Sequence, residues 1–215
     1  MNENLFQTEY DVTKKDKLKN FYSQNKSIIF ITIFIFIAAS LSIFFYAESQ
    51  KNKRAVLANN YVEAKINLEN GKKDVATNML KKLIFSNDQT YSTLSFLLVL
   101  NENLVSEKQE LLGLFDHIIN NNKFDNEITN LIIFKKLIFQ SSFSNESELL
   151  EIAKPLISTE TVWKPHVLLL MGDYFASKNE NMKAKDFYLQ ILSSQGLQKD
   201  FYEHARSKLS EITND

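Results

Sequence analysis

The chain has 215 residues, of which 44% are apolar and 24% charged, with 25 Lys and Arg against 26 Asp and Glu. A net charge of −1 gives no electrostatic reason to expect a nucleic-acid partner. The absence of Cys excludes disulfides, thiol nucleophiles and thiolate metal sites. Only four Gly and two Pro are present, which favours helices joined by short loops and predicts an all-α fold.

The first residues, 1–13, are polar and unpatterned, and we expect them to be disordered. Within residues 11–26, Leu18, Phe21 and Tyr22 stand at helical spacing among several Lys side chains. Two interpretations remain open: an amphipathic helix on an anionic membrane surface, or an unstructured basic flank that only sets topology. The predicted membrane-interface residues are Leu18, Lys19, Phe21, Tyr22 and Lys26.

Residues 27–47 contain no charge, Gly or Pro, and as a helix they would reach about 31 Å, close to the ~30 Å hydrocarbon core of a bilayer. Thirteen Ile, Phe and Leu residues predict favourable insertion. A buried strand would be shorter, and a cleaved signal peptide would have a shorter apolar core. The stretch therefore favours an uncleaved transmembrane anchor.

The predicted organisation has three parts: a cytoplasmic tail (1–26), a transmembrane helix (27–47) and a domain on the outer side of the membrane (48–215). Five Lys precede the span, and four basic residues lie within about 20 residues after it. Because positive residues favour the cytoplasmic side, this difference predicts that the N-terminus is inside. Because long domains translocate largely regardless of charge, the C-terminal domain is expected outside.

No helix breaker separates the span from Gly71, so we expect the span to continue into a soluble helix that ends there. A second helix carries an apolar side made of Val75, Ala76, Met79, Leu80, Leu83 and Ile84. Pro165 suits a first helical turn, whereas Pro155 is expected to kink or end its helix. Further helices are predicted at about 90–103, 107–121, 125–141, 145–157, 165–178, 181–194 and 199–213.

Residues 168–192 carry the clearest repeat signal, with the spacings of a tetratricopeptide repeat. Small residues at Gly172 and Ala184 would let two helices approach closely, while Phe175 and Tyr188 fill the space beside them. The usual turn glycine is replaced by Asn179, which tolerates a left-handed backbone. The predicted repeat-packing residues are Gly71, Ala76, Leu80, Gly172, Phe175, Ala184 and Tyr188.

A second copy lies 108 residues upstream, where Ala76 corresponds to Ala184. Three steps of 36 residues would place two divergent repeats between them, but those steps fall on Leu112 and Glu148, which are poor matches. We expect a helical-hairpin solenoid of about four helix pairs with a C-terminal capping helix. A generic hairpin bundle is the alternative.

This layout resembles the YfgM-type, tetratricopeptide-like ancillary subunits of the bacterial Sec translocon. The similar motifs are Leu18-Lys19-Asn20-Phe21-Tyr22 and Asn25-Lys26 before the span, Gly172-Asp173 in the last repeat, and Ala184 to Tyr188. The resemblance implies a single-pass inner-membrane protein that binds translocon components, periplasmic chaperones or secreted polypeptides.

The sequence offers no catalytic constellation. His117, His166 and His204 have no partner at metal-ligand or triad spacing, and the four Gly residues are too far apart for a phosphate loop. We therefore expect no cofactor, no small-molecule substrate and no enzymatic activity.

Repeat geometry alone suggests the partner-binding residues of the last hairpin, which are His166, Leu169, Asp173 and Ser177. They are equally explained as ordinary helix-surface positions, and Asp173 as an intramolecular hydrogen-bond partner. The first functional hypothesis is a membrane-anchored protein-binding module that assists export or folding at the translocon. The second is a cell-envelope scaffold or regulatory adaptor in cell division or outer-membrane assembly.

Overall fold

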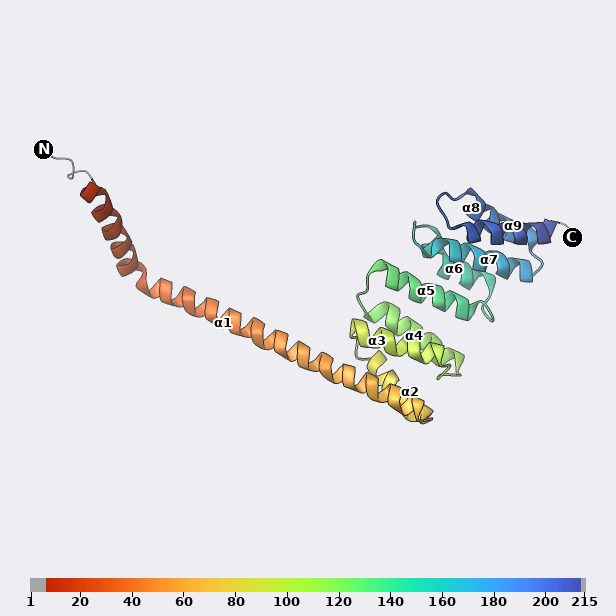
Figure 1. The fold of residues 1–215 in the computed structure, drawn as a ribbon, viewed down its shortest axis with the longest axis horizontal. Helices are drawn as coiled ribbons and strands as arrows, with labels where there is room; N and C mark the ends of the chain where they lie inside the picture. Colours follow the sequence, from red (N-terminus) through yellow and green to blue (C-terminus); the bar gives the residue numbers. More distant parts are fainter. Residues whose placement is uncertain (1–6, 214–215) are drawn as a thin grey trace. The chain divides into compact units, whose positions relative to one another are not determined.

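Every regular element in residues 7–213 of the computed structural model is an α-helix (Figure 1). Residues 1–6 and 214–215 lie outside the description, as do the side chains of residues 7–16 and Leu18. The helices are α1 Gln7–Glu69, α2 Lys73–Ile84, α3 Gln89–Asn101, α4 Lys108–Asn121, α5 Asn126–Gln140, α6 Glu146–Ile157, α7 Lys164–Ser177, α8 Asn181–Ser193 and α9 Lys199–Thr213. The predicted all-α class is confirmed.

The N-terminal helix α1 begins at residue 7, so the expected disorder over residues 7–13 and the unstructured flank over residues 11–26 are both wrong. The segment contains no Gly or Pro, and nothing stops a helix from extending through it. One described residue inside α1 departs from helical geometry: Asn25, with φ −113° and ψ 15°. Its side-chain amide donates a hydrogen bond to the carbonyl of Phe21 at 3.0 Å, so the kink lies just before the apolar stretch.

The side chains of residues 27–47 are nearly all exposed, and Phe34 and Phe36 are about three-quarters accessible (73% and 74%). Hydroxyls in this stretch bond to carbonyls one turn earlier; Thr32 Oγ1, for example, lies 2.8 Å from the carbonyl of Ile28. A polar group satisfied within its own helix adds little cost in hydrocarbon. By length and composition α1 is able to cross a membrane, a test that an N-terminal signal sequence also passes.

The chain divides into two compact units, residues 1–57 and 58–215. In the second unit the end of α1 forms a hairpin with α2, and Asn67 Nδ2 lies 3.7 Å from Met79 Sδ across it. Three further hairpins follow, α3 with α4, α5 with α6 and α7 with α8, before the final helix α9 (Figure 1). From α2 onward the substantial contacts join consecutive helices, and α7 also packs on α9. This sequential packing is that of a helical-hairpin stack, in which each pair contacts its neighbours.

Asn residues make several of the turns that a Gly-poor chain must form. Gly71 ends the first helix of the stack with φ 75°, but Asn87, Asn103 and Asn179 adopt left-handed φ values of 57°, 49° and 60°. Asn tolerates this region better than most residues because its short side chain bonds locally. The scarcity of Gly therefore does not prevent tight hairpins.

The repeat register differs from the predicted 36-residue steps. In each hairpin a buried residue of the first helix precedes a buried residue of the second by 12 positions; the pairs are Ala64 and Ala76, Val99 and Leu111, Leu137 and Leu149, and Gly172 and Ala184. Successive pairs are 35, 38 and 35 residues apart. The placement of repeat positions at Leu112 and Glu148 is therefore wrong: the step from Ala76 to Leu111 is 35 residues, and the step from Leu111 to Leu149 is 38, because three additional residues fall between Leu111 and Leu137.

The last hairpin is closed by a pair of small residues, whereas larger residues stand at the equivalent positions of the two middle hairpins. A Cβ added to Gly172 would lie 2.5 Å from Tyr188, and α7 packs far more closely on α8 than α3 does on α4. Ala184, Tyr188 and Phe175 are buried in the C-terminal core. At the other end, Ala76 and Leu80 are fully buried.

One local expectation needs correction, and another is met closely. Val75 is half exposed rather than part of the buried face of α2. Pro155 lies in the last turn of α6, which ends at Ile157, so the helix ends close to the proline, as expected, but not at it. The carbonyl of Pro155 accepts a hydrogen bond from Thr159 Oγ1 at 2.9 Å, so polar side chains complete that helix end. The other helix boundaries lie within about two residues of the prediction.

Candidate functional site

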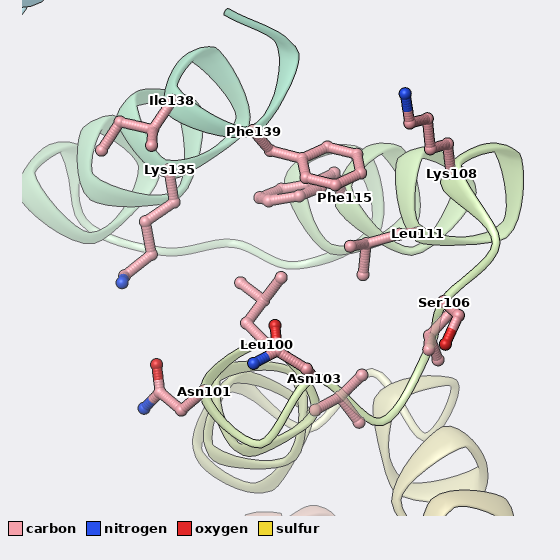
Figure 2. A pocket seen from close by; sticks show the side chains of 12 residues that line it. Leu100, Asn101, Asn103, Ser106, Lys108, Leu111, Phe115, Lys135, Ile138 and Phe139 are labelled. Atoms are coloured by element: carbon pink, nitrogen blue, oxygen red, sulfur yellow. The ribbon is translucent and has the colours of Figure 1, made fainter. Parts of the chain in front are cut away.

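A pocket of about 460 Å³ lies between α3, α4 and α5 (Figure 2). Ligand pockets commonly span about 300–1,000 Å³. The end of α3, the α3–α4 connection, the first half of α4 and the second half of α5 supply the lining residues, which are Val99, Leu100, Asn101, Asn103, Val105, Ser106, Lys108, Leu111, Phe115, Lys135, Ile138 and Phe139.

One position of the helix face predicted for binding recurs in this pocket. Leu100 and Ile138 each come directly after the packing position of the first helix in their hairpins, as Asp173 does in the last hairpin. Transferred with the observed register, the predicted face therefore meets this pocket, in the middle of the stack, at the position equivalent to Asp173.

Aromatic side chains form the floor of this pocket, and their contacts fix the ring positions. Figure 2 shows Phe115 and Phe139 side by side, and their ring centroids are 6.0 Å apart with planes inclined by 29°. Phe115 is fully buried and meets Phe96 edge-on at 4.8 Å. Offset and edge-on contacts of this kind favour a fixed ring geometry. The floor is therefore largely preformed.

The rim is cationic and rich in amides. Lys108 and Lys135 lie on opposite sides of the pocket, and the side chains of Asn101 and Asn103 border it (Figure 2). Lys108 Nζ lies 4.3 Å from the ring centroid of Phe143. None of the lining residues is Asp or Glu, and no carboxylate in the described part of the chain pairs with either Lys.

A second pocket of about 730 Å³ opens on another face of α4 and α5, bordered by α6. Here Lys136 Nζ is already paired with Asp116 Oδ1 at 2.6 Å, and Glu148 and Glu151 lie on the α6 side. The two pockets share no lining residue and differ in charge. Adjacent residues Lys135 and Lys136 thus belong to different sites.

In the last hairpin, Asp173 is an internal hydrogen-bond partner. Its Oδ1 accepts a hydrogen bond from the Tyr188 hydroxyl at 2.7 Å, and its Oδ2 lies 3.9 Å from His204 Nε2. Burial of the phenol, and to a lesser extent its hydrogen bond to Asp173, raise the pKa of Tyr188 well above its usual range. Asp173 is only half buried and so remains accessible to solvent.

The other predicted partner-binding residues have separate surroundings. His166 packs edge-on against Phe201, with ring centroids 4.9 Å apart, and also near Phe134 and Trp163. Leu169 packs on the C-terminal core, and the exposed Ser177 donates a hydrogen bond to the Tyr174 carbonyl. His166, Leu169, Asp173 and Ser177 line neither of the two pockets.

Most of the predicted membrane-interface residues are exposed on α1. These are Lys19, Phe21, Tyr22 and Lys26, whereas the side chain of Leu18 lies outside the described residues. Phe21 and Tyr22 are about half or more accessible. Exposed aromatics beside Lys are typical of a segment at the headgroup level of a membrane.

His117 is an interhelical residue. Its Nε2 lies 2.8 Å from Asn87 Oδ1, and its ring meets Phe85 edge-on at 4.5 Å, which joins α4 to the α2–α3 turn. Within the described residues, no group of three or more His, Cys, Asp or Glu side chains is placed to hold a metal ion.

The pocket between α3, α4 and α5, called the middle pocket below, was not predicted from the sequence. The sequence directed attention to the last hairpin because its repeat motif is clearest. The 12-residue spacing of Val99 and Leu111, repeated by Leu137 and Leu149, was the available signal. With that register, Lys108 and Lys135 would have been found on the two sides of one groove.

Comparison with protein-family models, curated proteins and solved structures finds no match for this chain. The site is therefore argued from the chain's own residues.

Proposed function

We propose that the chain is a membrane-anchored protein-binding module of the bacterial envelope. The observation that carries the proposal is the open pocket between α3, α4 and α5, which combines a preformed aromatic floor with a rim of Lys and Asn side chains. A few polar groups around an apolar floor suit the recognition of another molecule. In helical-repeat stacks such grooves commonly bind polypeptides.

Residues 27–47 would hold the protein in the inner membrane, with the N-terminal tail in the cytoplasm and the helical stack in the periplasm. This part of the proposal is supported by exposed apolar side chains and by hydroxyls satisfied within the helix. It is also supported by the Lys residues and exposed aromatics before the span.

The partners follow from the resemblance to YfgM-type subunits: translocon components, periplasmic chaperones or polypeptides emerging from the translocon. In this role the module would assist the export or folding of secreted proteins. The middle pocket, which is open to solvent, provides the surface on which a partner segment would bind.

A protease-accessibility experiment with a C-terminal tag tests location and partners together. In spheroplasts the tag should be digested by added protease while a cytoplasmic marker survives, and translocon subunits should copurify after mild solubilisation. A tag protected until the membrane is broken would contradict the proposed orientation. Septation defects with normal export on depletion would instead favour the scaffold role.

A further inference from the structure

We propose that the pocket between α3, α4 and α5 binds a polypeptide segment in which apolar side chains lie between Asp or Glu residues. This inference rests on the proposed protein-binding function and specifies the chemistry of the partner. It is carried by the charges and shape of the pocket.

Charge complementarity favours an acidic ligand. Lys108 and Lys135 give the pocket two positive charges, and its lining contains no carboxylate to neutralise them. The next residue along α5, Lys136, is paired with Asp116 on another face. Since the protein as a whole has a net charge of −1, this positive rim is a local feature and not the consequence of a basic chain.

The positions of the two Lys residues favour a segment with two separated carboxylates. Figure 2 shows Lys108 and Lys135 on opposite sides of the pocket, with Phe115 and Phe139 between them. Apolar side chains of a ligand would cover these rings, and one carboxylate would reach each Lys. A fatty acid has a single carboxylate and would leave one Lys without an anion.

Side-chain amides at the rim favour a peptide backbone. Asn101 and Asn103 each offer two N–H donors and one carbonyl acceptor, and Ser106 adds a hydroxyl. These groups match the alternating N–H and C=O groups of an extended peptide. An apolar lipid chain has no corresponding groups to bond with them.

The test measures fluorescence anisotropy of a labelled peptide, acetyl-Asp-Leu-Phe-Leu-Glu-amide, with the full chain in phosphatidylcholine nanodiscs at low ionic strength. The matched control peptide carries Asn and Gln in place of Asp and Glu. We expect the control peptide to bind about tenfold more weakly, because two exposed ion pairs are lost. The difference should shrink with added salt.

Variants of the protein test whether Lys108 and Lys135 cause the preference for the acidic peptide. The double variant Lys108→Gln, Lys135→Gln should bind both peptides with the weaker affinity, while Lys136→Gln should still discriminate between them. Three results would overturn the inference. The first is equal binding of the two peptides by the unchanged protein, and the second is loss of the discrimination in Lys136→Gln, as in the double variant. The third is displacement of the labelled acidic peptide by oleate at a lower concentration than by the same peptide without its label.

The outcomes separate this inference from the function on which it rests. If both peptides bound equally and Phe139→Ala weakened both, the pocket would be a protein-binding site without acidic preference, and only the inference would fail. If neither peptide bound, the inference would be wrong and the proposed binding function would lose its main support.

Discussion

Gly172 and Tyr188 are in such close contact that the space for a Cβ on Gly172 is occupied by the Tyr188 ring, 2.5 Å away at Cε1. This contact joins α7 to α8, which pack more closely than α3 on α4 or α5 on α6. The ring is fully buried and its hydroxyl donates to Asp173, so it has little freedom to move aside.

Gly172→Ala should destabilise the C-terminal hairpin by about 1–3 kcal/mol, because the added methyl overpacks a filled core. Gly113→Ala is the matched control, since nothing lies within 4 Å of its Cβ position in α4. Its expected effect is a stabilisation of about 0.5–1 kcal/mol through helix propensity. Urea unfolding followed by the fluorescence of Trp163, the only Trp, compares the two. Equal effects of the two changes would contradict the packing account.

Tyr188→Phe should cost about 1 kcal/mol at neutral pH through the lost hydrogen bond to Asp173, whose partly exposed carboxylate would be rehydrated. The substitution keeps the buried ring, so a loss as large as that of Gly172→Ala is not expected. The same fluorescence-detected urea midpoint measures it, and an unchanged midpoint would count against the hydrogen bond.

The raised pKa of Tyr188 also predicts a pH dependence. The folded state keeps this phenol neutral, whereas in the unfolded chain it ionises near pH 10. The contribution of Tyr188 to the free energy of unfolding is therefore fully present below about pH 10. Above that pH it falls by about 1.4 kcal/mol per pH unit. Tyr188→Phe should flatten this alkaline decline, and the raised pKa of Tyr61 contributes to the part that remains. Parallel declines in both proteins would contradict the prediction.

Two buried serines in α3 should respond oppositely to Ala. Ser95 Oγ is buried without a hydrogen-bond partner in the described part of the chain, whereas Ser92 Oγ donates to the Leu83 carbonyl at 3.0 Å. Ser95→Ala should stabilise by up to about 1 kcal/mol, and Ser92→Ala should destabilise by about 1–2 kcal/mol. Because both changes are Ser to Ala in one helix, propensity cancels in the comparison. Thermal unfolding by circular dichroism measures both.

The proposed membrane anchor can be tested by placing charged residues within residues 27–47. Replacing Ile35 and Ile37 with Lys should cost about 6–8 kcal/mol of insertion free energy, comparable with the whole estimated gain of about 4–8 kcal/mol from the apolar side chains. The variant should be released from membranes by alkaline carbonate, and the control with Leu at both positions should be retained. Intact mass of the retained protein distinguishes an uncleaved anchor from a cleaved signal.

Much of the fold was predictable because strong local signals agree. Asn145 caps α6 by accepting from the Glu148 N–H, and Gly71 and Asn179 supply the left-handed turns. Periodic apolar residues set the helices between these signals. These features depend on neighbours in sequence, which a single chain displays.

The candidate pocket was less predictable because it depends on register. Three additional residues between Leu111 and Leu137 shift the middle repeats, and a fixed 36-residue step then places solvent-facing Glu148 where a packing residue is needed. The role of Asp173 was also not predictable, because both partner binding and an intramolecular hydrogen bond were consistent with the sequence. The choice between them depends on the position of Tyr188 across the hairpin.

Site-specific photo-crosslinking in living cells tests the central claim most directly. A crosslinking residue at Leu100 or Ile138, on the two sides of the middle pocket, should capture translocon subunits, periplasmic chaperones or exported chains. The same residue at Leu189, exposed on α8 outside the pocket, should not. Adducts from Leu189 as abundant as those from Leu100 and Ile138, or no adducts from the pocket at all, would contradict the account.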